Sequence, residues 1–406
     1  MDITGADLRR ARREAKKAMT VFAGLAAMDR CHLHRVESGD RPVTPQVVEA
    51  YERVLGCSIQ PATPIQVETV TVDDMLRRRE LVMGVIATAS VGAAATEPLT
   101  RALSSLPTSV PSRVGVSEVE AVEQAVDDFT RLDLQYGGGL ALEVARGSLR
   151  WATKLLDQPM DNKIRGRLFA AVAALADRTA WSYFDTGLQG PAHQLFTLAL
   201  NTSAQGDDPD LWAHILLKMS IQIFALGHRE DAANLLRTPL GDSRISWTEI
   251  ADLHVIRGRH FAGVNDSQAA LRDLGLAEEA FAKAEPASGA RWAQRVTASP
   301  GHFDAGFGLA TFAAGKDKLA MEHFQAALAK LDPGRVRTAV RCQTRLAVLH
   351  MRAGNMDTAE NMARLAIADA KDLRSERIRQ DLAMVQIAAV EYKLRDLAAD
   401  LKVAAT

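Results

Sequence analysis

The C-terminal three-quarters of the chain contains an internal repeat, which restricts the possible folds more than any other feature. Four glycines at regular intervals are each followed five residues later by an alanine: Gly187/Ala192, Gly227/Ala232, Gly315/Ala320 and Gly354/Ala359. The glycines are separated by one period of about 40 residues, or once by two periods. Repeats of this length are typical of helical hairpins that stack because none can bury its apolar face alone. The sequence therefore predicts a stack of hairpins, with an irregular helical bundle as the alternative.

The residues around each glycine suit a turn between two antiparallel helices. Glycine adopts a positive φ at low cost, as such a turn requires. Two copies continue with an alanine, a phenylalanine and a second alanine at helical spacing: Ala192, Phe196 and Ala199, and Ala320, Phe324 and Ala327. The alanines would let a neighbouring helix approach closely, and the phenylalanine would fill the remaining gap. Gly137-Gly138-Gly139 is also predicted to be a turn between helices.

Composition sets the broad class of the protein. Lys plus Arg number 49 and Asp plus Glu 50, so the net charge is −1, and 47% of the residues are apolar. A normal core can form, and any contact with nucleic acid must be confined to a local patch. Cys31, Cys57 and Cys342 lie far apart and have neither disulfide nor zinc spacing, which suits a reducing cytoplasm. The polar N-terminus has no signal-peptide pattern, so a cytoplasmic location is expected.

Shifts in composition divide the chain into three parts. Residues 1–56 are expected to be a compact domain. Residues 57–116 are expected to be a linker that encloses an apolar helix of small residues at about 75–96. Residues 117–406 have helical periodicity, and Ser117-x-x-Glu120 is predicted to cap their first helix. The uncharged part of the linker helix is shorter than the ~20 residues of a membrane span, so packing against another helix is expected and membrane insertion is not.

Residues 4–56 are predicted to form five short helices. The third contains Arg30–Glu37, with Asp29 as its N-cap. Leu33 and Val36 would face the core, because residues three apart lie on one face of a helix.

This segment resembles the Xre-type (phage-repressor-like) helix-turn-helix family, without gaps. The match rests on Leu8, Arg12, Phe22-Ala23, Met28-Asp29-Arg30, Leu33 and Val36-Glu37-Ser38-Gly39. The resemblance implies that residues 29–37 are a recognition helix that enters the major groove of a double-stranded DNA operator. It places three residues at base-contacting positions, Arg30, Cys31 and Arg35, and further candidates for DNA contacts are His32, His34 and Arg41. It also implies a structural ion pair between Arg12 and Glu37.

The C-terminal region resembles tetratricopeptide repeats in a degenerate form with longer units. Leu331–Arg379 looks like the last third of a group of actinobacterial regulators in which a helix-turn-helix precedes such repeats. The expected fold is therefore all-α, with a five-helix helix-turn-helix domain followed by a tetratricopeptide-like α-solenoid. The solenoid is expected to form a homodimer, to bind a small-molecule or peptide effector, or both.

Arg337, Arg341 and Arg345 are spaced i, i+4 and i+8, so they form one stripe along a helix. If the stripe lines the concave side of the solenoid, it could bind a carboxylate or phosphate of an effector. The alternative is pairing with acidic residues on the next helix, which is the usual state of such stripes.

No motif for catalysis, a metal or a cofactor is present, so no enzymatic activity is expected. The favoured hypothesis is a sequence-specific DNA-binding transcriptional regulator. The alternative is a protein-interaction adaptor with a degenerate helix-turn-helix that does not bind DNA. Two departures from the family pattern favour the alternative: Ala18 stands where a capping Ser or Thr is usual, and Ala27 where the turn glycine is usual.

Overall fold

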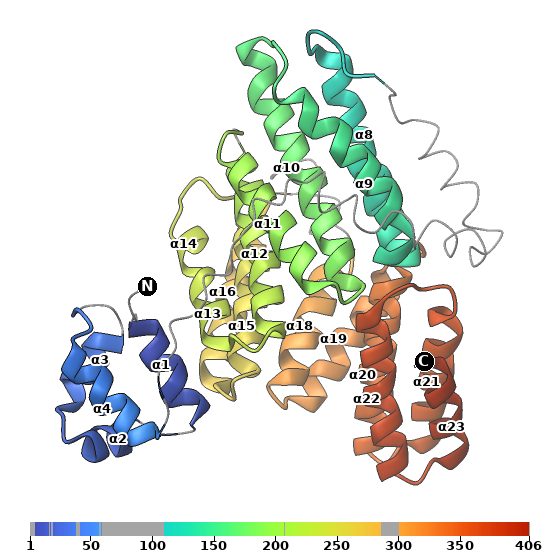
Figure 1. The fold of residues 1–406 in the computed structure, drawn as a ribbon. Coiled ribbons are helices and arrows are strands. Elements are labelled where there is room, and N and C mark those ends of the chain that lie inside the picture. The colour runs from blue at the N-terminus through green and yellow to red at the C-terminus, as the bar shows by residue number, and fades with distance from the viewer. Residues whose placement is uncertain are drawn as a thin grey trace. The chain divides into compact units, whose positions relative to one another are not determined.

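The computed structural model describes residues 5–15, 17, 19–37, 41–56, 58, 109–206, 208–285 and 300–405. Within these ranges the regular elements are all α-helices (Figure 1). The chain divides into two compact units, Met1–Asp74 and Met75–Thr406. The expected linker helix at 75–96 lies outside the described residues. Among the helices that are described, none combines the length and apolar character needed to cross a bilayer.

The N-terminal unit has four helices in its described part, α1 (Gly5–Glu14), α2 (Met19–Ala26), α3 (Arg30–Glu37) and α4 (Pro45–Leu55). The prediction of five helices in residues 4–56 is therefore wrong. Residues 41–44, between α3 and α4, are not helical and contain Pro42, and the interval is too short for another helix. The core of the unit includes Phe22 and Tyr51, whose ring centroids lie 4.4 Å apart.

The ends of these helices follow local capping rules. The Asp29 carboxylate accepts a hydrogen bond of 2.8 Å from the backbone N–H of His32, as expected for the N-cap of α3. Gly56 ends α4 in a left-handed conformation. Ala27, in the turn before α3, has a φ of 52°, which costs a residue with a Cβ about 1 kcal/mol or more.

The second unit is an array of seven helical hairpins in the described residues, called the hairpin array below (Figure 1). In chain order the hairpins are α8 (Val116–Tyr136) with α9 (Gly138–Leu155), α10 (Asn162–Asp185) with α11 (Gln189–Ser203), α12 (Pro209–Ala225) with α13 (Arg229–Leu235), α15 (Trp247–Ala262) with α16 (Ser267–Lys283), α18 (His302–Ala313) with α19 (Asp317–Lys330), α20 (Val336–Arg352) with α21 (Met356–Ala370), and α22 (Glu376–Glu391) with α23 (Arg395–Ala404). A short helix, α14 (Arg237–Leu240), follows α13.

The turns of six hairpins contain one residue with positive φ at an equivalent position. Four are the glycines of the repeat, with φ between 69° and 91°: Gly187, Gly227, Gly315 and Gly354. Asn265 and Lys393, each with a φ of 64°, occupy the same position in α15–α16 and α22–α23. Asn265 therefore fills the double interval between Gly227 and Gly315. The alanine five residues later is buried in all six: Ala192, Ala232, Ala270, Ala320, Ala359 and Ala398.

The array begins two residues earlier than the capping pattern indicated. The N-cap of α8 is Gly115, whose backbone N–H donates to the carboxylate of Glu118 at 2.7 Å. The predicted cap at Ser117 and Glu120 is wrong, because Ser117 already lies inside the first turn of α8. The segment just before it packs on the array: Val114 is buried, and its N–H donates to the carbonyl of Pro159.

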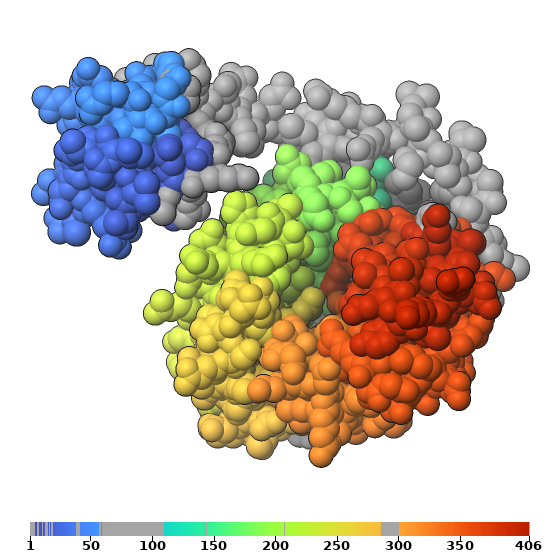
Figure 2. Space-filling model, turned by 90° about the horizontal axis from the view of Figure 1, so that it is seen from below, coloured from blue at the N-terminus to red at the C-terminus, as the bar shows by residue number. Residues whose placement is uncertain are grey.

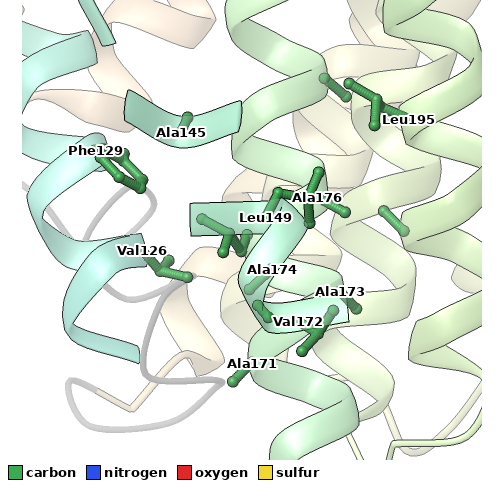
Figure 3. Packing of buried hydrophobic residues seen from close by; sticks show 14 of the residues in the cluster. Val126, Phe129, Ala145, Leu149, Ala171, Val172, Ala173, Ala174, Ala176 and Leu195 are labelled. Carbon is green, nitrogen blue, oxygen red and sulfur yellow. The ribbon is translucent and has the colours of Figure 1, made fainter. Parts of the chain in front are cut away.

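Small residues permit close packing at the start of the array. The largest apolar cluster joins α8, α9, α10, α11 and α12. In Figure 3 the short side chains of α10, among them Ala171, Ala173, Ala174 and Ala176, lie near Val126 of α8 and Leu149 of α9. Alanine side chains keep helix axes close, and the larger neighbours fill the space between them.

The array curls back so that its first hairpins contact its last two. The N–H of Arg374, before α22, donates to the carbonyl of Tyr136 at 2.9 Å, and the N–H of Gly139 donates to the carbonyl of Arg374 at 3.1 Å. A Cβ on Gly137 or Gly139 would lie within about 3 Å of Arg374, so the triple-glycine turn is required for this contact. Figure 2 shows the hairpins of this unit arranged around a central depression.

Candidate functional site

The outer face of α3 is polar and exposed. Leu33 and Val36 are fully buried in the core of the N-terminal unit, which turns the opposite face to solvent. Four of the candidate DNA-contact residues lie exposed on this face: Arg30, Cys31, His34 and Arg35. His32 is half-buried, and its Nδ1 lies 3.2 Å from Nη1 of the exposed Arg41.

A buried polar network holds α3 against two other helices. The Arg12 guanidinium of α1 donates two hydrogen bonds, of 2.6 and 2.7 Å, to the Glu37 carboxylate at the end of α3. The Tyr51 hydroxyl of α4 donates to the same carboxylate at 2.7 Å. Burial, and then this hydrogen bond, raises the pKa of Tyr51 well above its usual value, so the hydroxyl remains a donor. Because Arg–carboxylate pairs with two parallel bonds fix geometry, the network sets the orientation of α3.

The arginine stripe of α20 faces carboxylates. Arg337 Nη1 and Nη2 lie 2.6 and 2.7 Å from the two carboxylate oxygens of Asp133 on α8, and Nη1 lies 3.2 Å from Asp185 on α10. Arg341 and Arg345 both donate to Asp381 of α22, at 3.0 and 2.6 Å. The stripe is therefore paired with carboxylates, as in the alternative stated above, although Asp381 lies on the second helix after α20 and not on the next one. The partners of Arg337 lie at the far end of the array.

Other first helices of the hairpins also contact one another through buried titratable groups. Lys218 of α12 donates to Asp177 of α10, while burial and then the nearby Arg178 lower the pKa of Lys218 to about 8. Between the next two hairpins, Nδ1 of His214 on α12 lies 3.2 Å from Glu249 of α15. Burial lowers the pKa of His214 well below its usual value and raises that of Glu249 well above it, so both favour their neutral forms. These contacts join successive hairpins through polar groups.

A cavity of about 250 Å³ lies between the first helices of five hairpins and is called the central cavity below. Its charged lining comprises four arginines and two carboxylates: Arg259, Arg341, Arg345, Arg377, Glu376 and Asp381. Arg341 and Arg345 were expected candidates for an effector site, whereas Arg337 does not line this cavity. Arg259 of α15 and Arg377 of α22 were not predicted from the sequence. The i, i+4 spacing of Arg377 and Asp381 places both side chains on one face of a helix, and this spacing could have indicated a charged site there.

Within the described ranges, no group of three or more His, Cys, Asp or Glu residues is arranged to hold a metal ion. Of the cysteines in the described part of the chain, Cys31 is exposed and Cys342 is buried. Burial raises the pKa of Cys342 to about 12, which keeps it a thiol.

No protein-family model and no curated protein matches the chain. Among solved structures, it is similar to one described as a "Circular tandem repeat protein with novel repeat topology and enhanced subunit contact surfaces". The sequence identity is 13% and the TM-score 0.24, and the match covers 99% of this chain and 96% of that chain. A likeness at this TM-score carries no argument about function.

Proposed function

We propose that this protein is a sequence-specific DNA-binding transcriptional regulator, with an N-terminal helix-turn-helix domain and a tetratricopeptide-like α-solenoid. In this proposal α2 and α3 form the helix-turn-helix, and α3 enters the major groove of an operator. The observation that carries the proposal is the division of α3 into two faces. Arg30 and Arg35 are exposed on one, and Leu33 and Val36 are buried on the other.

The rigidity of the N-terminal unit supports this role. A helix that reads base edges needs a fixed orientation, because bidentate contacts between arginine and guanine depend on direction. The network of Arg12, Glu37 and Tyr51 ties α3 to α1 and α4 through buried, charge-assisted hydrogen bonds.

The hairpin array would supply dimerisation and a response to an effector. In a homodimer the two α3 helices would read half-sites about 34–36 Å apart, so a change in array curvature would alter their separation and weaken binding. The segment just before α8 supports a route for such coupling. Trp151 Nε1 of α9 donates to the carbonyl of Ser109 at 3.0 Å, and Val114 is buried against the array.

The test is a titration of fluorescently labelled DNA from the region upstream of the protein's own gene, measured by anisotropy at several salt concentrations. Arg30→Ala and Arg35→Ala should each weaken specific binding by about 5- to 150-fold, which corresponds to the ~1–3 kcal/mol of a bidentate contact to guanine. Arg364→Ala removes an exposed arginine of the array, on α21, and is the matched control. Specific binding that neither variant weakens beyond the control would contradict the proposal.

A protein-interaction adaptor is the second candidate, and one observation favours it. Val21 and Leu25 lie one turn apart on α2 and are 58% and 55% exposed, which is unusual for large apolar residues in a small domain. If the adaptor function is correct, Val21→Ser with Leu25→Ser abolishes partner binding. The same titration would then show no sequence-specific binding, whereas specific binding that weakens steeply with salt supports the regulator.

A further inference from the structure

The central cavity has an uncompensated positive charge. Asp381 is its one carboxylate bound to lining arginines, and it is shared between Arg341 and Arg345. The other carboxylate, Glu376, accepts hydrogen bonds from Arg379, which is not part of the lining. Four arginines and two carboxylates therefore leave a formal excess of two positive charges.

The lining arginines that no carboxylate pairs with are Arg259 and Arg377; Asp185, outside the lining, attracts Arg377 but forms its ion pair with Arg337. Neither the Arg259 nor the Arg377 side chain forms an ion pair or hydrogen bond with any residue that the structure describes, and both residues are half-buried at the cavity wall. Arg377 is held by aromatic faces instead, with its guanidinium carbon 4.8 Å from the Trp181 ring centroid and 5.2 Å from that of Phe184. Burial, and then repulsion from Arg341 and Arg345, lowers the pKa of Arg259 to about 9.

Withdrawing guanidinium groups from water without a partner is costly, so this arrangement destabilises the empty array. An anion in the cavity would relieve that cost, because the planar guanidinium binds phosphate and carboxylate through two parallel hydrogen bonds. Part of the wall is apolar and formed by Phe184, Ile221 and Phe224. A cavity of about 250 Å³ is near the lower end for small-molecule sites, which limits the ligand to a compact body.

A larger hollow, between α8 and α10, differs in its charge. It has a volume of about 530 Å³ and is lined by Arg167 and Lys163 together with Glu123, Asp127 and Asp208. Arg167 donates two hydrogen bonds of 2.7 Å to Glu123, so this arginine is already paired. The uncompensated arginines thus point to the central cavity.

We propose that the central cavity binds a small organic dianion, a phosphate monoester or a dicarboxylate with an apolar body of about one ring, through Arg259 and Arg377. The charged group would lie between the two unpaired guanidinium groups, with Arg341 and Arg345 nearby, and the apolar body would pack on Phe184 and Phe224. That this dianion is the effector of a regulator rests on the function proposed above. Its binding to the array does not depend on that function.

The experiment measures binding to the full chain without DNA, by calorimetry and by the shift in melting temperature at constant ionic strength. Phenyl phosphate and phthalate are the two dianionic probes, and benzamide is the neutral control of similar size. One dianion bound per chain, with a rise in melting temperature, is the expected result. The probe that binds with the higher affinity identifies phosphate or dicarboxylate as the preferred group. A failure of DNA binding would be seen separately, in the anisotropy titration.

Two variants assign the site. Arg259→Gln and Arg377→Gln should each lower the affinity for the stronger probe at least tenfold, because each removes a charged donor. Without a probe, Arg259→Gln should melt at or above the temperature of the unmodified chain, because a half-buried charge without a partner has been removed; a purely structural arginine would lower it. Arg364→Gln, on the exposed surface of α21, is the control. No dianion binding by the unmodified chain, equal binding of benzamide, or undiminished binding by both variants would overturn the proposal.

Discussion

Replacement of Arg337 by methionine should loosen the contact between the two ends of the hairpin array. The Arg337 side chain is 9% exposed, and those of its partners Asp133 and Asp185 are 4% and 0% exposed. Removing one partner of a buried ion pair leaves the other charge without compensation and costs about 3–5 kcal/mol. Exposed pairs contribute far less: Arg113 and Asp161 have side chains 64% and 67% exposed, and Arg113→Met should change the free energy of unfolding by under about 1 kcal/mol.

Urea unfolding followed by far-ultraviolet circular dichroism measures both changes. With a slope of about 3 kcal/mol per molar urea, the Arg337→Met variant should unfold at a urea concentration lower by about 1–1.7 M. Adding Asp133→Leu to Arg337→Met should recover at least part of the lost free energy of unfolding, because two apolar side chains then replace the ion pair of Arg337 and Asp133. If Arg337→Met alters the midpoint no more than Arg113→Met does, the charged contact does not hold the ends of the array together.

Three further predictions concern single residues. Lys393→Gly should raise the free energy of unfolding by about 0.5–1 kcal/mol in urea unfolding, because Lys393 has a φ of 64°, whereas Lys402→Gly, inside α23, should lower it by about as much. Ala27→Gly should slow hydrogen exchange in α2 and α3, because glycine adopts the positive φ of position 27 without strain. Unchanged exchange would show that this turn is not strained. Burial, and then Arg259, lowers the pKa of His260 in the folded chain to about 3, so between pH 6.5 and 3 the unfolded chain binds the extra proton and stability falls as the pH falls. His260→Gln should reduce that slope by up to about 1.4 kcal/mol per pH unit and leave the slope above pH 7.5 unchanged; an unaltered slope would contradict the assignment.

Features that depend on neighbouring residues could be predicted from the sequence. The glycine turns of the hairpins and the buried alanines after them follow from backbone preferences and side-chain size, which act within a few residues. The inward face of α3 follows from helical periodicity for the same reason. Two hairpin turns were missed because glycine served as the marker: Asn265 and Lys393 occupy the same left-handed position, and only the spacing and the following alanine reveal them.

The partners of the buried charges were decided by the tertiary structure alone. Arg337 meets Asp133 from the other end of the array, and Arg259 of α15 faces the same cavity as Arg377 of α22. These encounters depend on the curvature of the array, which sums small rotations between many successive hairpins. A local pattern can place an arginine on a helix face. Whether a carboxylate lies opposite it is determined only when distant helices are brought together.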